Sequence, residues 1–377
     1  MMAGKNLKIT FFTLAIAMLI AMLVISRDAG ISGDEEVHYK QSEFVYSYFK
    51  TMGKDQSALY TPETHLQYYG QAFDNLVTIL THWFNIRDVY GFRHLMCSIS
   101  GWLTILVTGL FAVYISGYGA GILVLLLFAI SPTFLGHAQN NLKDIPFALA
   151  YISSLYYSIR LVFSENKLLW KDITLLILSI GLSVGIRAGG ILVIFYLGLF
   201  LILKVASEVI RNKKFDINQF MRRAIICGGI ALAGYLLGLV LWPYGLRNPI
   251  LHPWKAYEVM TRFPTTVRQI FEGQFDWSDF HPWYYLPKYM ALTIPLVVLA
   301  GVAVFFLNTK KNYPQETQLQ LALVVFSIVF PVLFVLVKQS NLYGSWRHFL
   351  FIYPGIVLLA ALGIFSLFRQ IKSRWQS

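Results

Sequence analysis

Charge is scarce in this sequence. Only 13% of its 377 residues are charged, whereas 56% are hydrophobic and 16% aromatic, and the mean hydropathy is +0.58. A soluble protein of this size could not cover its surface with so few polar side chains. The composition therefore excludes a soluble fold and predicts an all-α, polytopic membrane protein.

Cysteine is equally scarce, and repeats are lacking. Cys97 and Cys227 both fall inside apolar segments, where each behaves as a small buried hydrophobe and implies neither a disulfide nor a metal site. We find no low-complexity segment and no internal repeat, which counts against a transporter built from matching halves. Asn-x-Ser/Thr acceptors are absent too, consistent with a bacterial source.

Apolar runs close to the length that crosses a bilayer, about 20 residues, predict about ten transmembrane helices. They cover residues 7–25, 92–115, 118–135, 143–163, 168–186, 188–205, 223–241, 289–307, 318–337 and 347–368. The first run lacks a small-x-small cleavage site, so we expect a retained span rather than a signal peptide.

The distribution of charge predicts the orientation. Most acidic residues fall on one side of the predicted spans, and basic clusters fall on the other, in short segments and at helix ends. By the positive-inside rule the basic side, including the N-terminus, is cytoplasmic. The net charge of +12 is thus an orientation signal and not a nucleic-acid footprint. The inner cations are Lys5, Lys8, Lys167, Lys171, Arg211, Lys213, Lys214, Arg222, Arg223, Lys310, Lys311, Arg369, Lys372 and Arg374.

Two long external loops, 26–91 and 242–288, are rich in aromatic residues. We expect them to contain interfacial helices and to roof a cavity at the outer membrane surface, within a single membrane domain covering residues 1–377. In the first loop, apolar side chains at helical spacing predict an amphipathic helix on the membrane surface: Val37, Phe44, Val45 and Tyr48.

An acidic run, Asp34-Glu35-Glu36, followed by His38, lies just after the first span. Consecutive carboxylates repel one another and resist burial, so the run indicates a water-accessible site at the membrane edge. The simpler interpretation is a solvated loop that helps to set the topology.

A second acid, Asp144, occupies a short polar loop on the same outer side. It is either a functional carboxylate at the mouth of a helix pair or a helix N-terminal acid that the dipole favours, with Pro146 in the first turn. Basic residues lie near the outer ends of spans, where they either snorkel to lipid headgroups or bind a phosphate carried on a lipid: Arg93, His94, Arg187, Arg247, Lys288, Arg347 and His348.

Carboxylates and cations on one membrane face suit sugar transfer from a lipid phosphate. Such a reaction needs a base for the acceptor hydroxyl and a cation for the leaving phosphate. No ligand spacing demands a metal, although a divalent cation near His38 stays open as a cofactor.

The chain resembles the GT-C membrane glycosyltransferases, especially the group of protein O-mannosyltransferases and lipid A aminoarabinose transferases. The resemblance covers most of the chain. It is carried by Asp34-Glu35 after the first span, Ser131-Pro132 followed by Asp144, the phrase His281-Pro282-Trp283-Tyr284-Tyr285, and Arg347-His348 with Pro354.

The resemblance implies an inverting transfer from a polyprenyl-phosphate sugar to a lipid, glycan or protein on the outer face of a bacterial inner membrane. Asp34 would be the base, Glu35 its neighbour and Asp144 a second essential acid. Relatives often carry Pro-Pro and a basic residue in the first loop, where this chain has residues 64–70 instead. The phosphate ligand is therefore left among the basic residues Arg93, His94, Arg187, Arg247, Arg347 and His348.

A polytopic transporter or flippase of a lipid-linked or small anionic substrate is the alternative. Binding a lipid phosphate would use the same cations without any chemical step.

Overall fold

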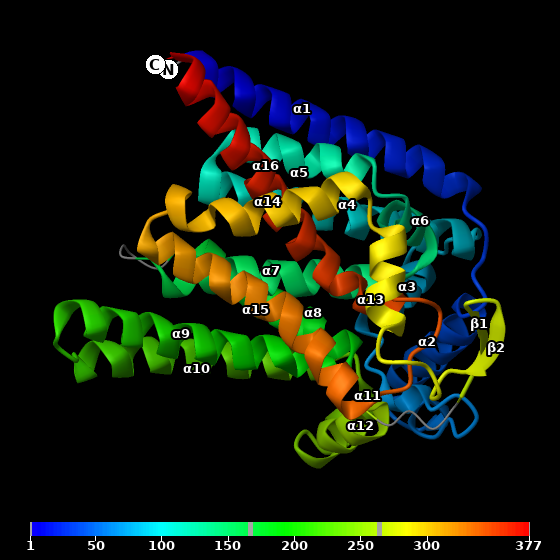
Figure 1. Ribbon diagram of the computed structural model, residues 1–377. Coiled ribbons are helices and arrows are strands. Elements are labelled where there is room, and N and C mark those ends of the chain that lie inside the picture. The colour runs from blue at the N-terminus through cyan, green and yellow to red at the C-terminus, as the bar shows by residue number, and fades with distance from the viewer. Residues whose placement is uncertain (1, 165–168, 262–265, 377) are drawn as a thin grey trace. The chain divides into compact units, whose positions relative to one another are not determined.

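The computed structural model describes residues 2–164, 169–261 and 266–376, and most of them are helical (Figure 1). Lys167 and residues 262–265 of the second external loop lie outside the described residues. The helices are α1 Met2–Ile25, α2 Glu35–Lys50, α3 Ala72–Trp83, α4 Val89–Ser116, α5 Tyr118–Ala129, α6 Pro132–Asn140, α7 Asp144–Val162, α8 Trp170–Ile186, α9 Leu192–Asn212, α10 Ile217–Leu239, α11 Pro243–Arg247, α12 Leu251–Thr261, α13 Tyr285–Thr293, α14 Leu296–Asn312, α15 Gln315–Lys338 and α16 Tyr353–Gln376.

The strands in the described residues form one short antiparallel hairpin, β1 Arg268–Phe271 and β2 Gln274–Trp277, with Arg268 opposite Trp277. The predicted all-α polytopic class is confirmed.

Seven helices of the described chain are long and apolar enough to cross a membrane, or up to nine if each of two bent pairs forms one span. The bends are 75° between α5 and α6 and 109° between α13 and α14. The sequence predicted continuous spans over 118–135 and 289–307. The first breaks at Pro132, the first residue of α6, and the second at Pro295, which directly precedes α14. Proline restricts the preceding residue and lacks an N–H donor. The predicted span over 168–186 corresponds to α8, which has 17 residues and is not among the seven helices long enough to cross a membrane.

The chain divides into two compact units. The first contains the described residues up to Ala29, Cys97–Ala148 and the described residues from Thr261 onward, and the second contains Gly30–Met96 and Leu149–Met260.

In the first unit, α14 and α16 approach closely through small residues. A Cβ added to Gly363 would lie 2.2 Å from the carbonyl oxygen of Gly301, and one added to Gly301 would lie 2.8 Å from that of Ala360. Small side chains let two membrane helices bring their backbones together, and dispersion contacts then hold the pair. The crossing of α14 and α16 therefore depends on glycine.

In the second unit, the first long loop is anchored to the helices α8 and α10. A Cβ on Gly70 would lie 1.8 Å from the carbonyl oxygen of Gly185, so the loop backbone rests directly on the end of α8. Just beyond α10, the indole of Trp242 is only 2% exposed and donates to the carbonyl oxygen of Gln67 at 2.9 Å. These contacts give the loop a fixed path.

Helix α2 buries its polar side. Its buried residues are Glu35, His38, Gln41, Ser42 and Val45. Of the apolar side chains that predicted an amphipathic helix, only Val45 lies on this buried face, whereas Val37 is 42% exposed. A buried polar helix face is stable only when neighbouring elements supply partners for it. Helices α3 and α4 supply partners for Ser42 and Glu35, and the loop before α3 supplies them for His38 and Gln41.

We expect Gly363→Ala to lower the stability of the protein by about 1–3 kcal/mol, because the new methyl group forces α16 away from α14. Gly229→Ala is the matched control, since a Cβ there meets nothing within 4 Å. Thermal unfolding in detergent, followed by tryptophan fluorescence, measures the difference. Equal midpoints for the two variants would contradict the close crossing.

Candidate active site

The acidic run at the start of α2 is divided among three environments. Asp34 immediately precedes the helix and is half-buried, and its carbonyl oxygen accepts the first-turn bond from the amide of His38 at 3.1 Å. Glu35 is only 3% exposed, whereas Glu36 is exposed. Successive helical residues point about 100° apart, so adjacent carboxylates face different surroundings.

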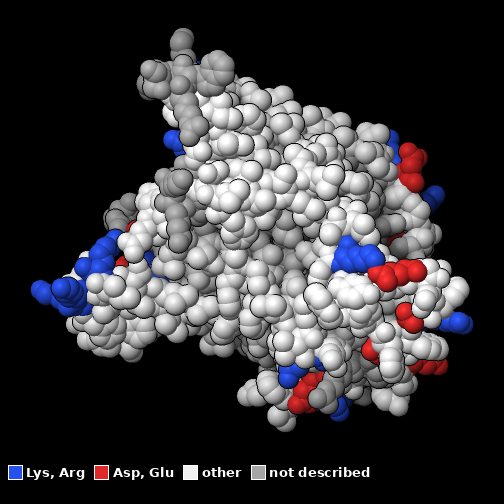
Figure 2. Space-filling view, viewed as in Figure 1, with Lys and Arg blue, Asp and Glu red and all other residues white. Residues whose placement is uncertain are grey.

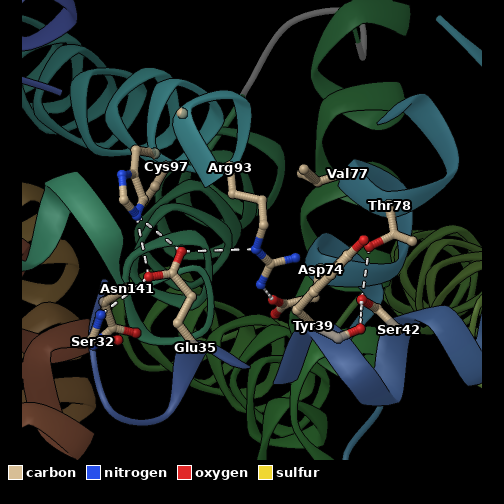
Figure 3. Close-up of polar contacts among 12 residues, drawn as sticks. Ser32, Glu35, Tyr39, Ser42, Asp74, Val77, Thr78, Arg93, Cys97 and Asn141 are labelled. Carbon is tan, nitrogen blue, oxygen red and sulfur yellow. Dashed lines mark hydrogen bonds and ion pairs between the residues drawn. The ribbon is translucent and has the colours of Figure 1, made fainter. Parts of the chain in front are cut away.

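Glu35 points into the protein and is held by two neighbouring residues of α4 (Figure 3). The Nε2 atom of His94 lies 3.0 Å from Oε1 and 3.1 Å from Oε2 of Glu35. The Nε atom of Arg93 lies 3.8 Å from Oε1, and the amide of Ser32 donates to Oε2 at 3.2 Å. These contacts fix the first turn of α2 against the start of α4.

Arg93 also binds a second buried carboxylate. Its Nη2 atom donates to Oδ1 of Asp74, on α3, at 2.6 Å, and its guanidinium lies 5.3 Å from the centre of the Tyr39 ring (Figure 3). Arg93 and Asp74 are 1% and 2% exposed. Charges removed from water are tolerated when they are paired, so one guanidinium between two carboxylates ties α2, α3 and α4 together.

Tyr39 and Ser42 continue this polar packing along α2. Burial, together with a hydrogen bond to Glu43, raises the pKa of Tyr39 to about 12. The hydroxyl of Ser42 lies 2.7 Å from that of Thr78 on α3. One turn before Ser42 on the same face, the side chains of His38 and Gln71 contact each other.

In the first unit, Asp144 begins α7 and is 3% exposed. Its amide donates to Oδ1 of Asn141 at 2.9 Å, and Nδ2 of Asn141 donates to Oδ2 of Asp144 at 2.9 Å. His137 lies within electrostatic range of both Asp144 and Arg347. The place of Asp144 at a helix start matches its simpler interpretation.

The remaining predicted cations occupy separate places. Arg347 and His348 begin the 3₁₀ turn Arg347–Ile352 in the first unit, and both lie against the ring of Tyr343, at 5.4 Å and 4.6 Å from its centre. In the second unit, Arg187 is half-buried directly after α8, and Arg247 is exposed at the end of α11.

The sequence did not single out Asp74 or Asn141 as site residues. A signal for Asp74 was present, because it is a carboxylate in the largely apolar segment that forms α3, where an ionised group needs a partner. Nothing in the sequence identifies Arg93 as that partner, since the two residues meet only after α3 and α4 have packed.

Within the ranges that the structure describes, no group of three or more His, Cys, Asp and Glu side chains is arranged to hold a metal ion.

No family model and no curated protein matches the chain. Solved structures share its architecture, and two of them are states of one protein. ArnT from Cupriavidus metallidurans bound to undecaprenyl phosphate has a TM-score of 0.64 at 13% sequence identity, and the match covers 94% of this chain and 60% of ArnT. The chain has an ArnT-like GT-C fold. The apo state of ArnT gives a TM-score of 0.59 at 12% identity, over 96% of this chain and 60% of ArnT. The chain therefore spans about three fifths of the length of ArnT.

We expect Arg93→Leu to destabilise this ArnT-like fold by about 3–5 kcal/mol, because two buried carboxylates lose their countercharge. In the double variant Arg93→Leu/Asp74→Leu, one of those carboxylates is gone, and the loss should be smaller than the sum of the single losses by at least about 1 kcal/mol.

Unfolding in detergent of the wild type, both single variants and the double variant measures this coupling. Arg247→Leu, at an exposed arginine, is the control and should change stability by less than about 0.5 kcal/mol. Simple addition of the single effects would show that Arg93 and Asp74 do not stabilise each other.

Proposed function

We propose that this multi-pass membrane protein is a glycosyltransferase that moves a sugar from a polyprenyl-phosphate donor to a lipid, glycan or protein. The observation that carries the proposal is the ArnT-like fold with a half-buried Asp34 directly beside a buried, ion-paired Glu35. The solved ArnT structure contains undecaprenyl phosphate, and we infer the same class of lipid carrier for this chain.

Asp34 is the better base of the two carboxylates. Glu35 is engaged by His94 and Arg93 and is shielded from solvent, so an acceptor hydroxyl cannot reach it without breaking those contacts. Asp34 precedes the helix and retains accessible surface. A general base must come within hydrogen-bond distance of the proton that it removes, which favours the accessible carboxylate.

Arg93 and His94 then position Glu35, and the phosphate is left to other cations. We assign it to Arg347 and His348, which lie together on Tyr343. His137, near both Arg347 and Asp144, links this pair to the second acid. Arg187 and Arg247 stay as further candidates.

The reaction that these roles support is a single displacement. Asp34 takes the proton of the acceptor hydroxyl, the hydroxyl oxygen forms a bond to the anomeric carbon, and the bond from that carbon to the phosphate oxygen breaks with inversion. The negative charge that develops on the leaving lipid phosphate is stabilised by the cations that bind that phosphate. No nucleotide sugar takes part.

The distribution of charged residues supports a site on the outer face, which in a bacterial inner membrane is the periplasmic side. A flippase or transporter for a lipid-linked or small anionic substrate is the competing function, since the same cations would hold a lipid phosphate without transferring its sugar.

We expect Asp34→Asn to fold normally and to bind polyprenyl phosphate, but to lower the rate of sugar transfer about 10²–10⁴-fold, the range for loss of a general base. Glu36→Gln is the matched control, because Glu36 is in the same run but exposed, and it should keep near-normal activity.

Mass spectrometry of lipids and glycans from cells lacking the protein, complemented with each variant, reads out the missing product and its acceptor. Near-normal transfer by Asp34→Asn would rule out Asp34 as the base. Movement of a lipid-linked substrate across vesicles with no new glycosidic bond would favour the transporter.

A further inference from the structure

Helices α9 and α10 form an antiparallel hairpin whose tip is very short (Figure 1). Only the four residues Lys213–Asp216 connect α9 and α10, and both helices belong to segments long and apolar enough to cross a membrane. Their outer surfaces are apolar, as with Ile202, Ile225 and Leu232, which are 58%, 68% and 60% exposed. A turn this short between two spans must lie at the membrane surface.

The tip carries a concentration of positive charge, visible as the blue group at the end of the hairpin in Figure 2. Arg211, Lys213, Lys214 and Arg222 are all exposed. The one acid of the connection, Asp216, is occupied as a helix cap, because its Oδ1 atom accepts from the amides of Asn218 and Gln219 at 3.0 Å each. The cations therefore set the potential of the tip.

Large apolar side chains are interleaved with these cations. They are exposed to between 48% and 79%: Ile210, Phe215, Ile217 and Met221. A solvated charged turn has no reason to display four such side chains together. Alternating basic and apolar groups suit the boundary between phospholipid headgroups and acyl chains, where each kind finds its own environment.

A partly buried ion-pair cluster joins the two helices near the tip. Glu208 of α9 lies 3.5 Å from the Nζ atom of Lys204 and 3.0 Å from the Nη1 atom of Arg223 on α10. Lys204 is only 4% exposed, and its ammonium lies 5.2 Å from the centre of the Phe163 ring. Glu208 thus offsets part of the positive charge between the two helices, and its contacts join α9 to α10 next to the exposed cations.

We propose that the tip of the α9–α10 hairpin is a docking surface for the headgroups of anionic phospholipids. The negatively charged headgroups complement the exposed cations, and the start of the acyl-chain region complements the exposed apolar side chains. Because α9 and α10 are both long and apolar enough to span a membrane, they place the tip at the level of these headgroups. An acidic protein or peptide would match the charge alone. This inference is independent of the proposed glycosyltransferase activity.

The test uses the full chain in phosphatidylcholine nanodiscs that contain spin-labelled phosphatidylglycerol. The wild type should immobilise phosphatidylglycerol in preference to labelled phosphatidylcholine, and raising the salt concentration should weaken that preference. The variant Lys213→Gln/Lys214→Gln/Arg222→Gln should lose the preference by about tenfold, because each cation near an anionic surface adds to the attraction.

Two further variants test whether a loss of the lipid preference comes from the tip itself, from a lower net charge of the protein, or from misfolding. Lys40→Gln/Lys54→Gln/Arg87→Gln removes three exposed cations elsewhere and should keep the preference. Lys213→Arg/Lys214→Arg/Arg222→Lys keeps every charge at the tip and should behave as the wild type. The proposal would be overturned if the first control lost the preference for phosphatidylglycerol as strongly as the glutamine variant, or if the glutamine variant kept it. Tighter binding of a polyglutamate peptide than of phosphatidylglycerol would also overturn it.

Discussion

The ion pair between Arg93 and Asp74 is the interaction on which the arrangement of α2, α3 and the start of α4 in the second unit depends. Helix α2 turns carboxylate, imidazole, amide and hydroxyl groups inward, and such a helix cannot pack against an apolar surface. Arg93 solves this at one end by placing a single guanidinium between Glu35 and Asp74, 3.8 Å and 2.6 Å away. Because each carboxylate comes from a different helix, the pairing specifies the positions of α2, α3 and α4 at once.

A buried charge network of this kind contributes specificity more than stability. Apolar residues of similar volume could pack these helices at least as tightly, since desolvating three charges offsets much of their mutual attraction. The directional contacts of Glu35 with Arg93 and His94, unlike apolar contacts, fix the orientation of the start of α2 about its helix axis. With Glu35 locked by His94 and Arg93, the preceding residue has a defined direction, and that residue is Asp34.

Much of the fold follows from the sequence because the bilayer acts on it directly. Hydropathy alone located a helix at each predicted span, since a membrane-crossing segment must be both apolar and helical. The bends at Pro132 and Pro295 could not be predicted from hydropathy, because the apolar run continues across each bend. The burial of the polar face of α2 could not be predicted. Its partners Asp74 and Arg93 are remote in sequence, and an acidic run at a membrane edge is equally typical of a solvated loop.

The division of the acidic run gives the Asp-Glu pair a physical meaning beyond its resemblance to a family motif. Two adjacent carboxylates in one environment would each raise the other's pKa, and neither would be a dependable ionised base. Placing them on different faces at the start of α2 removes that conflict. Glu35 is shielded from solvent by its contacts with Arg93 and His94, whereas Asp34 keeps accessible surface. The buried member of the pair thus supplies geometry, and the half-buried member keeps the accessible surface that the chemistry needs.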